Sequence, residues 1–402
     1  MAGISCAGSR AQPVWEPSPY EPRAWRPVEV TRNGPIFADN VLSMTAGGSG
    51  SSLEKGPRGR RLCWTLLDRL HPGPVSSPFW RAIFQPEPDS LLRVLGESLP
   101  AVDFAALSDP ANEELLLECV ADSVDEARYW QEPDEMDVAL ADPRLSAALA
   151  PVAARVAASP AATWWSAGLD PSRQVFVDKE EGSTKAAPVF RDARAVLEIW
   201  RDQVTGPGTR HRGQWVGGPW WSTPQWSIVA KDLERYGQHP PIVAATSQSR
   251  PGLGAVGLLL EEDTFGTPTA RCWPVRPSSP VRVFEIDGAD EWMELVSTYG
   301  VDVTGKRIAH WSIATGLDRR WIIPDWSAAA SDYDAVHLTV NGYLTTSGRA
   351  LSVSTASATF LAGWNPDVSF WLSDVLDVVG PPQSWTAQES NPARRWRPAE
   401  TT

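Results

Sequence analysis

A carboxylate and an imidazole stand three residues apart in the segment from Asp334 to His337, at the start of a predicted strand. Such a pair could act as general acid and general base, or the carboxylate could orient the imidazole. Tyr343, further along the chain, could donate a phenolic hydrogen bond to the same region. A structural histidine within a sheet is the alternative. The pattern makes Asp334 and His337 candidate catalytic residues.

A second candidate group combines basic and aromatic side chains. The run from Arg210 to Trp215 places Arg212 near Trp215, and Trp221 follows shortly after. Arginines hold phosphate or pyrophosphate through forked hydrogen bonds, and stacked indoles suit a flat ligand such as a nucleobase, nicotinamide or indole. A solvated loop and ordinary tryptophan packing are the alternatives.

Small hydroxyl residues follow an apolar run at Thr246, Ser247 and Ser249, where they could orient a ribose or a phosphate. They are also common turn formers. Beyond the next apolar run lies the acidic stretch Glu261–Asp263. Within it Glu262 could act as a base or stabilise a cationic intermediate, although solvated turns are often acidic.

Composition excludes several classes of protein. The formal net charge is -13 and the isoelectric point is near 5.0, which argues against a duplex nucleic-acid binder. The cysteines form no C-x-x-C pair, and we expect no disulfide framework and no metal site. The chain shows no phosphate loop, dinucleotide fingerprint or nucleophile elbow. It also lacks an apolar leader or span, so we expect a cytoplasmic protein that does not enter a membrane.

The first part of the chain divides by composition. Residues 1–60 are rich in Pro, Ser, Gly and Arg, with a linker-like run at 46–52, and predict a mostly disordered tail. Residues 61–160 show helical periodicity. Asp109 and Pro110 predict the start of one helix, and Asp142 caps a second helix predicted over 143–156.

Residues 161–387 are rich in tryptophan and read as an α+β domain, followed by a second disordered tail over 388–402. Asn341-Gly342 lies between two alternating runs, which predicts a hairpin over 336–346. Asp287 is expected to cap a helix that ends at Gly300. The other predicted strands are 174–177, 242–245, 256–260 and 281–286. The fold class is therefore α+β: a helical N-terminal region packed on a mixed, largely antiparallel sheet domain.

Two resemblances follow from these segments. The last part of the chain, including Ile323–Trp326, Tyr333–Thr339 and Ala362–Asp367, resembles conserved proteins of actinomycetes, which implies no activity. The chain also resembles mono-ADP-ribosyltransferases in the order of its motifs: a basic residue, then a hydroxyl-rich strand, then an acidic residue. That resemblance implies NAD as substrate, with Arg212 on the pyrophosphate, Thr246, Ser247 and Ser249 on the hydroxyl-rich strand, and Glu262 or Asp334 as the carboxylate.

Three functions remain open at this stage. The first is an NAD-consuming ADP-ribosyltransferase-like enzyme. The second is a tailoring enzyme for an aromatic or indole-like metabolite, with Asp334 and His337 as acid and base. The third is a non-enzymatic interaction or immunity protein, for which a protein partner would replace the small aromatic or nucleotide-like ligand.

Overall fold

The computed structural model of the chain describes residues 52–72, 77–179, 187–206, 209–211, 214–216, 221–224, 243–262, 268–389 and 394–399. Arg212 and all but the last residue of the linker-like run at 46–52 lie outside these residues. All described residues belong to one unit, Pro35–Thr402. None of the described helices combines the length and apolar character that a membrane span requires.

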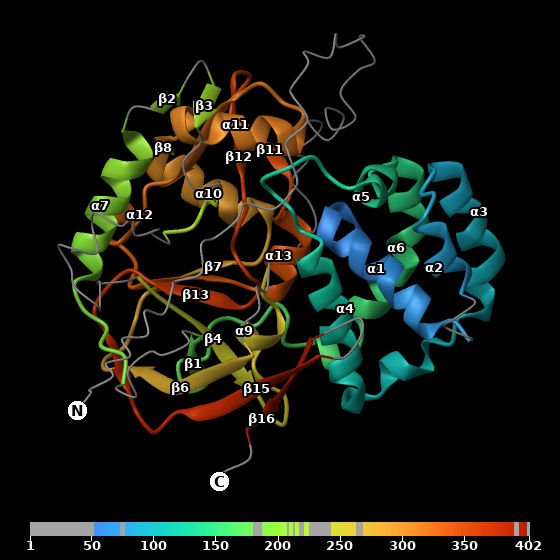
Figure 1. Ribbon diagram of the computed structural model, residues 1–402, viewed down its shortest axis with the longest axis horizontal. Helices are drawn as coiled ribbons and strands as arrows, with labels where there is room; N and C mark the ends of the chain where they lie inside the picture. The colour runs from blue at the N-terminus through green and yellow to red at the C-terminus, as the bar shows by residue number, and fades with distance from the viewer. Residues whose placement is uncertain are drawn as a thin grey trace, which may run out of the picture. The chain divides into compact units, whose positions relative to one another are not determined.

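The first described part of the chain is helical, as expected for 61–160, and its helical structure begins earlier, within the stretch 1–60 that was predicted as a mostly disordered tail. Its helices are α1 Pro57–Leu70, α2 Pro78–Ala82, α3 Pro88–Ser98, α4 Glu113–Asp125, α5 Glu135–Leu140 and α6 Pro143–Ala157. Short 3-10 turns separate them at Leu53–Lys55, Leu99–Ala101, Phe104–Ser108, Pro110–Asn112 and Pro160–Ala162. In Figure 1 these helices form a group beside the sheet-containing part.

The helix starts follow the capping chemistry of the sequence. Asp142 accepts a hydrogen bond from the backbone N of Arg144 at 2.8 Å and caps α6, as expected. Asp109 caps the 3-10 turn Pro110–Asn112 instead of α4 itself, which begins at Glu113. The predicted helix is therefore present, with one tighter turn in front of it.

A large mixed sheet dominates the rest of the unit. Its main path runs β16-β15-β6-β1-β4-β13-β10-β7, and every pair on it is antiparallel except the parallel pair β10–β7. β14 pairs with β6, and β5 with β4. The strands are β1 Gln174–Asp178, β4 Ala244–Arg250, β5 Gly254–Ala255, β6 Thr269–Pro277, β7 Val283–Ile286, β10 Ala335–Leu338, β13 Val368–Trp371, β14 Leu376–Val378, β15 Gln383–Glu389 and β16 Arg394–Pro398. The last two overlap the stretch 388–402, for which the sequence predicted no fixed structure.

A smaller sheet in the order β11-β12-β9-β8 and a two-stranded sheet of β2 and β3 complete the strands. Their bounds are β2 Thr209–His211, β3 Gln214–Val216, β8 Gly300–Asp302, β9 Arg320–Pro324, β11 Ala350–Ser352 and β12 Ser357–Phe360. The remaining helices are α7 Ala193–Thr205, α9 Val256–Leu259, α10 Ala289–Tyr299, α11 Thr304–Thr315, α12 Trp326–Ala329 and α13 Val340–Thr346. The expected α+β class is confirmed.

One core joins the helical region to the rest. Leu66 and Val120 belong to the same cluster of buried side chains as Trp321 and Phe360. Tyr129, which follows α4, packs edge-to-face on Phe360 with ring centroids 5.7 Å apart. The helices therefore pack on the sheet-containing region through shared apolar burial.

The predicted hairpin over 336–346 is wrong. β10 ends at Leu338, and Thr339 caps helix α13 by accepting a hydrogen bond from Gly342 N at 2.9 Å. Val340, Tyr343 and Leu344 are buried at helical spacing. A Cβ on Gly342 would lie 2.2 Å from the carbonyl oxygen of Ile286, so this glycine permits close packing and does not form a turn with positive φ.

Two smaller expectations also need correction. The run from Val256 is helix α9, not a strand; Gly257 N donates to Ser247 Oγ at 2.8 Å, which anchors this helix on β4. Asp287 does not cap α10, because its carboxylate accepts from Thr339 Oγ1 at 2.5 Å.

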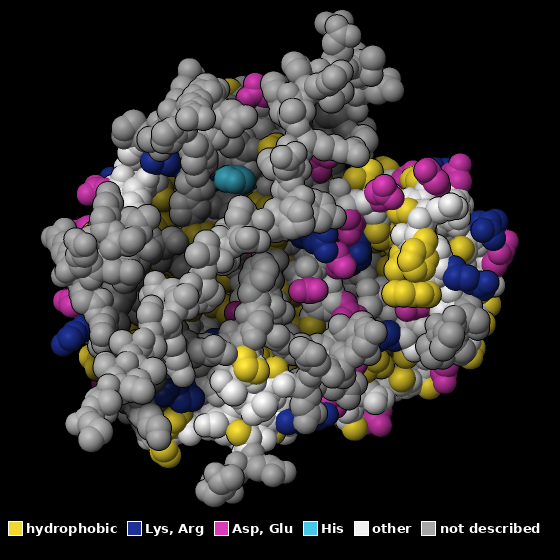
Figure 2. Space-filling model, viewed as in Figure 1, with side chains coloured by type: hydrophobic (Ala, Val, Ile, Leu, Met, Phe, Trp, Pro, Cys, Tyr) yellow, Lys and Arg dark blue, Asp and Glu magenta, His cyan; other side chains and the backbone are white. Residues whose placement is uncertain are grey.

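The surface of the helical region carries exposed apolar side chains, seen as yellow atoms in Figure 2. Trp80 and Phe84 are 46% and 67% exposed, and their rings meet edge-to-face at 5.6 Å. Two exposed aromatic side chains are ordinary for a protein surface and define no site by themselves.

Candidate functional site

A cavity of about 360 Å³ lies against one face of the large sheet, and we call it the sheet cavity. Its size falls within the range of small-molecule sites. The residues that line it are Val175, Phe176, Val177, Lys179, Val243, Ala245, Thr246, Ser247, Gly257, Glu261, Gly363, Asn365, Val368 and Phe370.

Strand alternation decides which side chains face this cavity. Ser247 pairs with Val175 on one side and Val368 on the other, and Ala245 pairs with Phe370. Residues directly opposite one another in a sheet share a face. The floor of the sheet cavity is therefore apolar, with Ser247 as its polar member.

Two hydrogen-bond donors at the sheet cavity remain available for a ligand. Ser247 Oγ accepts from Gly257 N, and its own proton has no acceptor among the described residues. Asn365 Oδ1 accepts from Glu262 N at 3.2 Å, and no described group accepts from its Nδ2. Both groups would satisfy an acceptor oxygen of a bound molecule.

An ion pair between Lys179 and Glu261 stands at the edge of the sheet cavity. The two side chains are 19% and 28% exposed, so the pair is partly screened by solvent. Lys179 was not expected from the sequence, and Glu261 was named only as part of the acidic stretch in which Glu262 was the candidate residue. Their separation along the chain left no linear signal for this pairing.

The opposite face of the same sheet carries a different polar group. Its row of paired residues runs Glu285, His337, Ser369, Thr246 across β7, β10, β13 and β4. His337 is 2% exposed, and its Nδ1 lies 2.5 Å from Glu285 Oε2. Its Nε2 lies 3.5 Å from Asp367 Oδ1. An imidazole thus stands between two carboxylates.

The partners of His337 are themselves fixed. Asp367 accepts from Gln248 N at 2.9 Å and from Gln248 Nε2 at 2.7 Å, while Glu285 Oε1 accepts from Leu169 N at 2.9 Å. Asp367 also adopts a φ of 61°, which is uncommon for a residue with a side chain. Burial by itself would lower the pKa of His337, but the hydrogen bonds and charges of Asp367 and Glu285 outweigh it and raise that pKa to about 9.

Asp334 does not join His337. Its carboxylate accepts from Arg282 N at 2.9 Å, from the Arg282 guanidinium, and from Ser373 Oγ at 3.2 Å. The hydrogen bonds from Arg282 lower the pKa of Asp334. The expected pairing of these two residues is therefore absent, and each has other partners.

The hydroxyl residues on β4 have separate surroundings. Thr246 Oγ1 donates to Gln174 Oε1 at 2.6 Å and accepts from Trp371 Nε1 at 2.8 Å, on the face of His337. Ser247 faces the sheet cavity, and Thr246 also contributes to the lining of that cavity although its hydroxyl is bonded on the other face. Ser249 lies further along the strand, where it pairs with Ala255.

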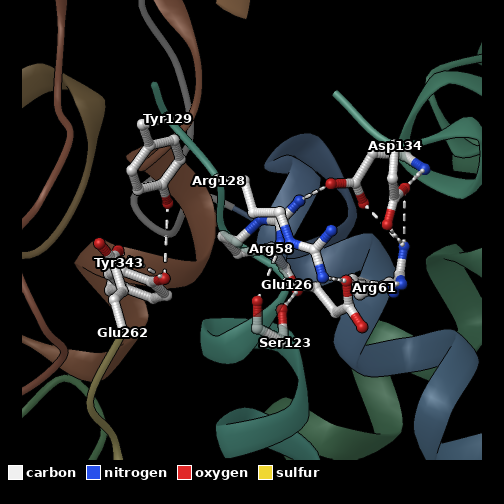
Figure 3. Close-up of polar contacts among 10 residues, drawn as sticks. Arg58, Arg61, Ser123, Glu126, Arg128, Tyr129, Asp134, Glu262 and Tyr343 are labelled. Carbon is white, nitrogen blue, oxygen red and sulfur yellow. Dashed lines mark hydrogen bonds and ion pairs between the residues drawn. The ribbon is translucent and has the colours of Figure 1, made fainter. Parts of the chain in front are cut away.

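Glu262 points away from the sheet cavity into a polar network shown in Figure 3. Tyr343 donates to Glu262 Oε1 at 3.2 Å, and the hydroxyls of Tyr343 and Tyr129 lie 3.4 Å apart. Burial is the main cause that raises the pKa of Tyr343. The contact between Tyr129 and Tyr343 connects the helical region with α13, and nearby Arg58 donates to Ser123 O at 2.9 Å within the helical region.

The basic-aromatic segment is only partly described. For Trp215 the backbone lies in β3, and Arg212 lies outside the described residues. The carbonyl of Trp221 accepts from Arg307 Nε at 3.1 Å. Arg307 is fully buried, and burial lowers its pKa to about 9. The later tryptophans Trp311, Trp321 and Trp326 are fully buried in the core, which is the packing alternative of the sequence analysis.

No protein-family model, curated protein or solved structure matches the chain. The two resemblances therefore stay predictions, and the geometry of the described residues is what supports a function.

Proposed function

We propose that the protein binds a small molecule with a largely apolar body and an acceptor oxygen, in the sheet cavity. The observation that carries the proposal is the pairing of an apolar floor with two unused donors, Ser247 Oγ–H and Asn365 Nδ2. A carbonyl or carboxylate oxygen would accept from both, while the ring or chain of the ligand covers Val368 and Phe370. Apolar walls with a few placed polar groups are typical of such sites.

A thermal-shift screen of the purified chain tests this function. The probes are indole, indole carboxylic acids, nicotinamide and NAD, since a ligand that binds only the folded state raises the melting temperature. Ala245→Phe would fill the cavity and abolish the shift. Ser247→Ala would weaken binding by about tenfold, the value of one hydrogen bond.

Ser249→Ala is the matched control, because Ser249 lies on the same strand but outside the cavity lining. It should leave the shift unchanged. If Ala245→Phe retains full binding of a ligand that stabilises the wild-type chain, that ligand occupies another site and the proposal fails.

A second candidate function, cleavage of NAD, is favoured by one observation. Glu261 places a carboxylate at the same cavity as the hydroxyl residue Ser247, and a carboxylate there could stabilise an oxocarbenium-like ribose. The test is release of nicotinamide from NAD, with Glu261→Gln expected to suppress release while NAD still binds. Binding of NAD without release would leave the protein a binder only.

A further inference from the structure

A second cavity, lined by α1, the segment 126–137 and the segment 348–360, has a basic wall. We call it the arginine cavity. Its basic lining residues are Lys55, Arg58, Arg60, Arg128 and Arg349. It adjoins the network of Figure 3, where Arg58 and Arg128 are labelled. So many cations at one place stand out in a chain with a net charge of -13.

Each of the three carboxylates on this wall already has an arginine partner. The pairs are Arg58 with Asp137, Arg61 with Asp134 at 3.0 Å, and Arg128 with Glu126 at 3.5 Å. These three acids are therefore paired with arginines other than Arg60 and Arg349. They form no ion pair with Lys55, Arg60 or Arg349.

Lys55, Arg60 and Arg349 have no carboxylate within ion-pair distance among the described residues. Arg60 is only 6% exposed; its Nη1 donates to the carbonyls of Glu54 and Lys55, and its Nε is buried without a partner. Arg349 donates to the carbonyl of Thr345 at 2.9 Å. Carbonyls orient a guanidinium but do not neutralise it. The positive charge is therefore offset only by carboxylates beyond ion-pair distance, Asp137 and Glu54 for Arg60 and Asp290 for Arg349, in a partly desolvated place.

The first turn of α1 adds to this field. Helix N-termini favour acidic residues, yet α1 has none in its first turn and carries Arg58 and Arg60 there. Its N-cap, Gly56, supplies no side-chain hydrogen bond. A bound anion near this helix start would be favoured by the helix dipole and by the charges of the arginines.

The size of the arginine cavity limits the ligand. Its volume is about 70 Å³. One water needs roughly 10–15 Å³, so the space holds roughly five to seven water-sized atoms. That matches a tetrahedral oxyanion and excludes a nucleotide from full enclosure.

We infer that the arginine cavity binds a phosphate-sized oxyanion, held by Arg60 and Arg349 with Lys55 at its edge. Guanidinium forks match the oxygens of phosphate, which makes phosphate a better fit than chloride. The anion is either free phosphate or the phosphoryl group of a small ester whose remainder extends outside. This site is separate from the sheet cavity and does not depend on its function.

Titration of the full chain with inorganic phosphate, followed by thermal shift and calorimetry, tests the site. We expect phosphate to raise the melting temperature more than chloride at equal ionic strength. Arg349→Gln should weaken phosphate binding by at least about tenfold. The difference in melting temperature between wild type and this variant should therefore grow with phosphate concentration. A purely structural role of Arg349 would give a constant difference.

Arg93→Gln is the control, since Arg93 forms an exposed pair with Glu97 within α3. It should not change phosphate affinity, and neither should Ser247→Ala. A parallel titration with glycerol phosphate distinguishes the two sources: tighter binding than inorganic phosphate assigns the site to an ester. If neither probe exceeds chloride, or if Lys55→Gln combined with Arg349→Gln leaves phosphate affinity intact, the inference is overturned.

Discussion

The two faces of the large sheet use the same strands for opposite purposes. On β4, Ala245 and Ser247 face a cavity where donors remain unused, whereas Thr246 and Gln248 face a network in which their partners are fixed. The second face holds the stronger charges, yet His337 lines none of the three described cavities. Strong polar chemistry and availability to a ligand are therefore separate properties, and here unused donors beside an apolar wall point to the binding face.

The largest expected effect comes from disrupting the hydrogen-bonded network around His337, on the face of the sheet that we call the closed face. Asp367→Ala removes one of the two carboxylates beside His337 and leaves the Gln248 side chain without its acceptor. Loss of one partner from a buried charged group costs about 3–5 kcal/mol of unfolding free energy. Urea denaturation measures the loss. Asp377→Ala, at an exposed position, is the control, and a loss below about 1 kcal/mol would show that the network does not stabilise the fold.

The closed face also predicts a dependence of stability on pH. The pKa of His337 is raised from 6.5 to about 9, so the folded state holds a proton that the unfolded state releases above 6.5. Stability from this group is complete below pH 6.5 and is lost as the pH rises through about 9. Melting temperature should fall over that window. His337→Gln should flatten the profile, and an unchanged slope in this variant would assign the effect to another group.

Elements that depend on local chemistry could be predicted from the sequence. Asp142 and Pro143 define the start of α6, and the strand over 174–177 is present as β1. Residues 336–346 could not be predicted in the same way, because Val340, Tyr343 and Leu344 fit helical spacing while Asn341-Gly342 fits a turn. The close approach of Gly342 to Ile286 decides in favour of the helix, and that contact is tertiary.

The candidate site was predictable only in part, for the same reason. The sequence shows Thr246, Ser247 and Ser249 as a run of hydroxyl residues. Only the register of β4 shows that the Thr246 and Ser247 side chains lie on opposite faces of the sheet. Glu285 and Asp367 contact His337 from β7 and from the turn before β13. No spacing in the sequence predicts these two contacts. The sequence named the stretch Glu261–Asp263 but chose Glu262 as the candidate, whereas in the structure Glu261 lies at the sheet cavity and Glu262 bonds Tyr343.

Two substitutions on β4 test whether the two faces of the sheet act independently, and the expected loss of stability is moderate. Thr246→Val leaves Trp371 Nε1 without an acceptor and should lower unfolding free energy by about 2 kcal/mol. Ligand affinity should change less than in Ser247→Ala, because the Thr246 hydroxyl is bonded on the other face of the sheet. Ser247→Ala should cost about 1 kcal/mol of stability and about tenfold in affinity. Denaturation and calorimetry on both variants give the two readouts. Equal losses of affinity would mean that the faces are not independent.

The smallest expected effect is at the edge of the sheet cavity. Glu261→Gln removes the charge that Lys179 faces, but both side chains are partly exposed, so stability should fall by less than about 1 kcal/mol. Salt screens such a pair, and the difference from wild type should shrink as ionic strength rises. Denaturation at two salt concentrations measures it. A loss above about 2 kcal/mol that salt does not reduce would place this pair with the closed face, as a structural element, and would leave Ser247 and Asn365 alone to recognise the ligand.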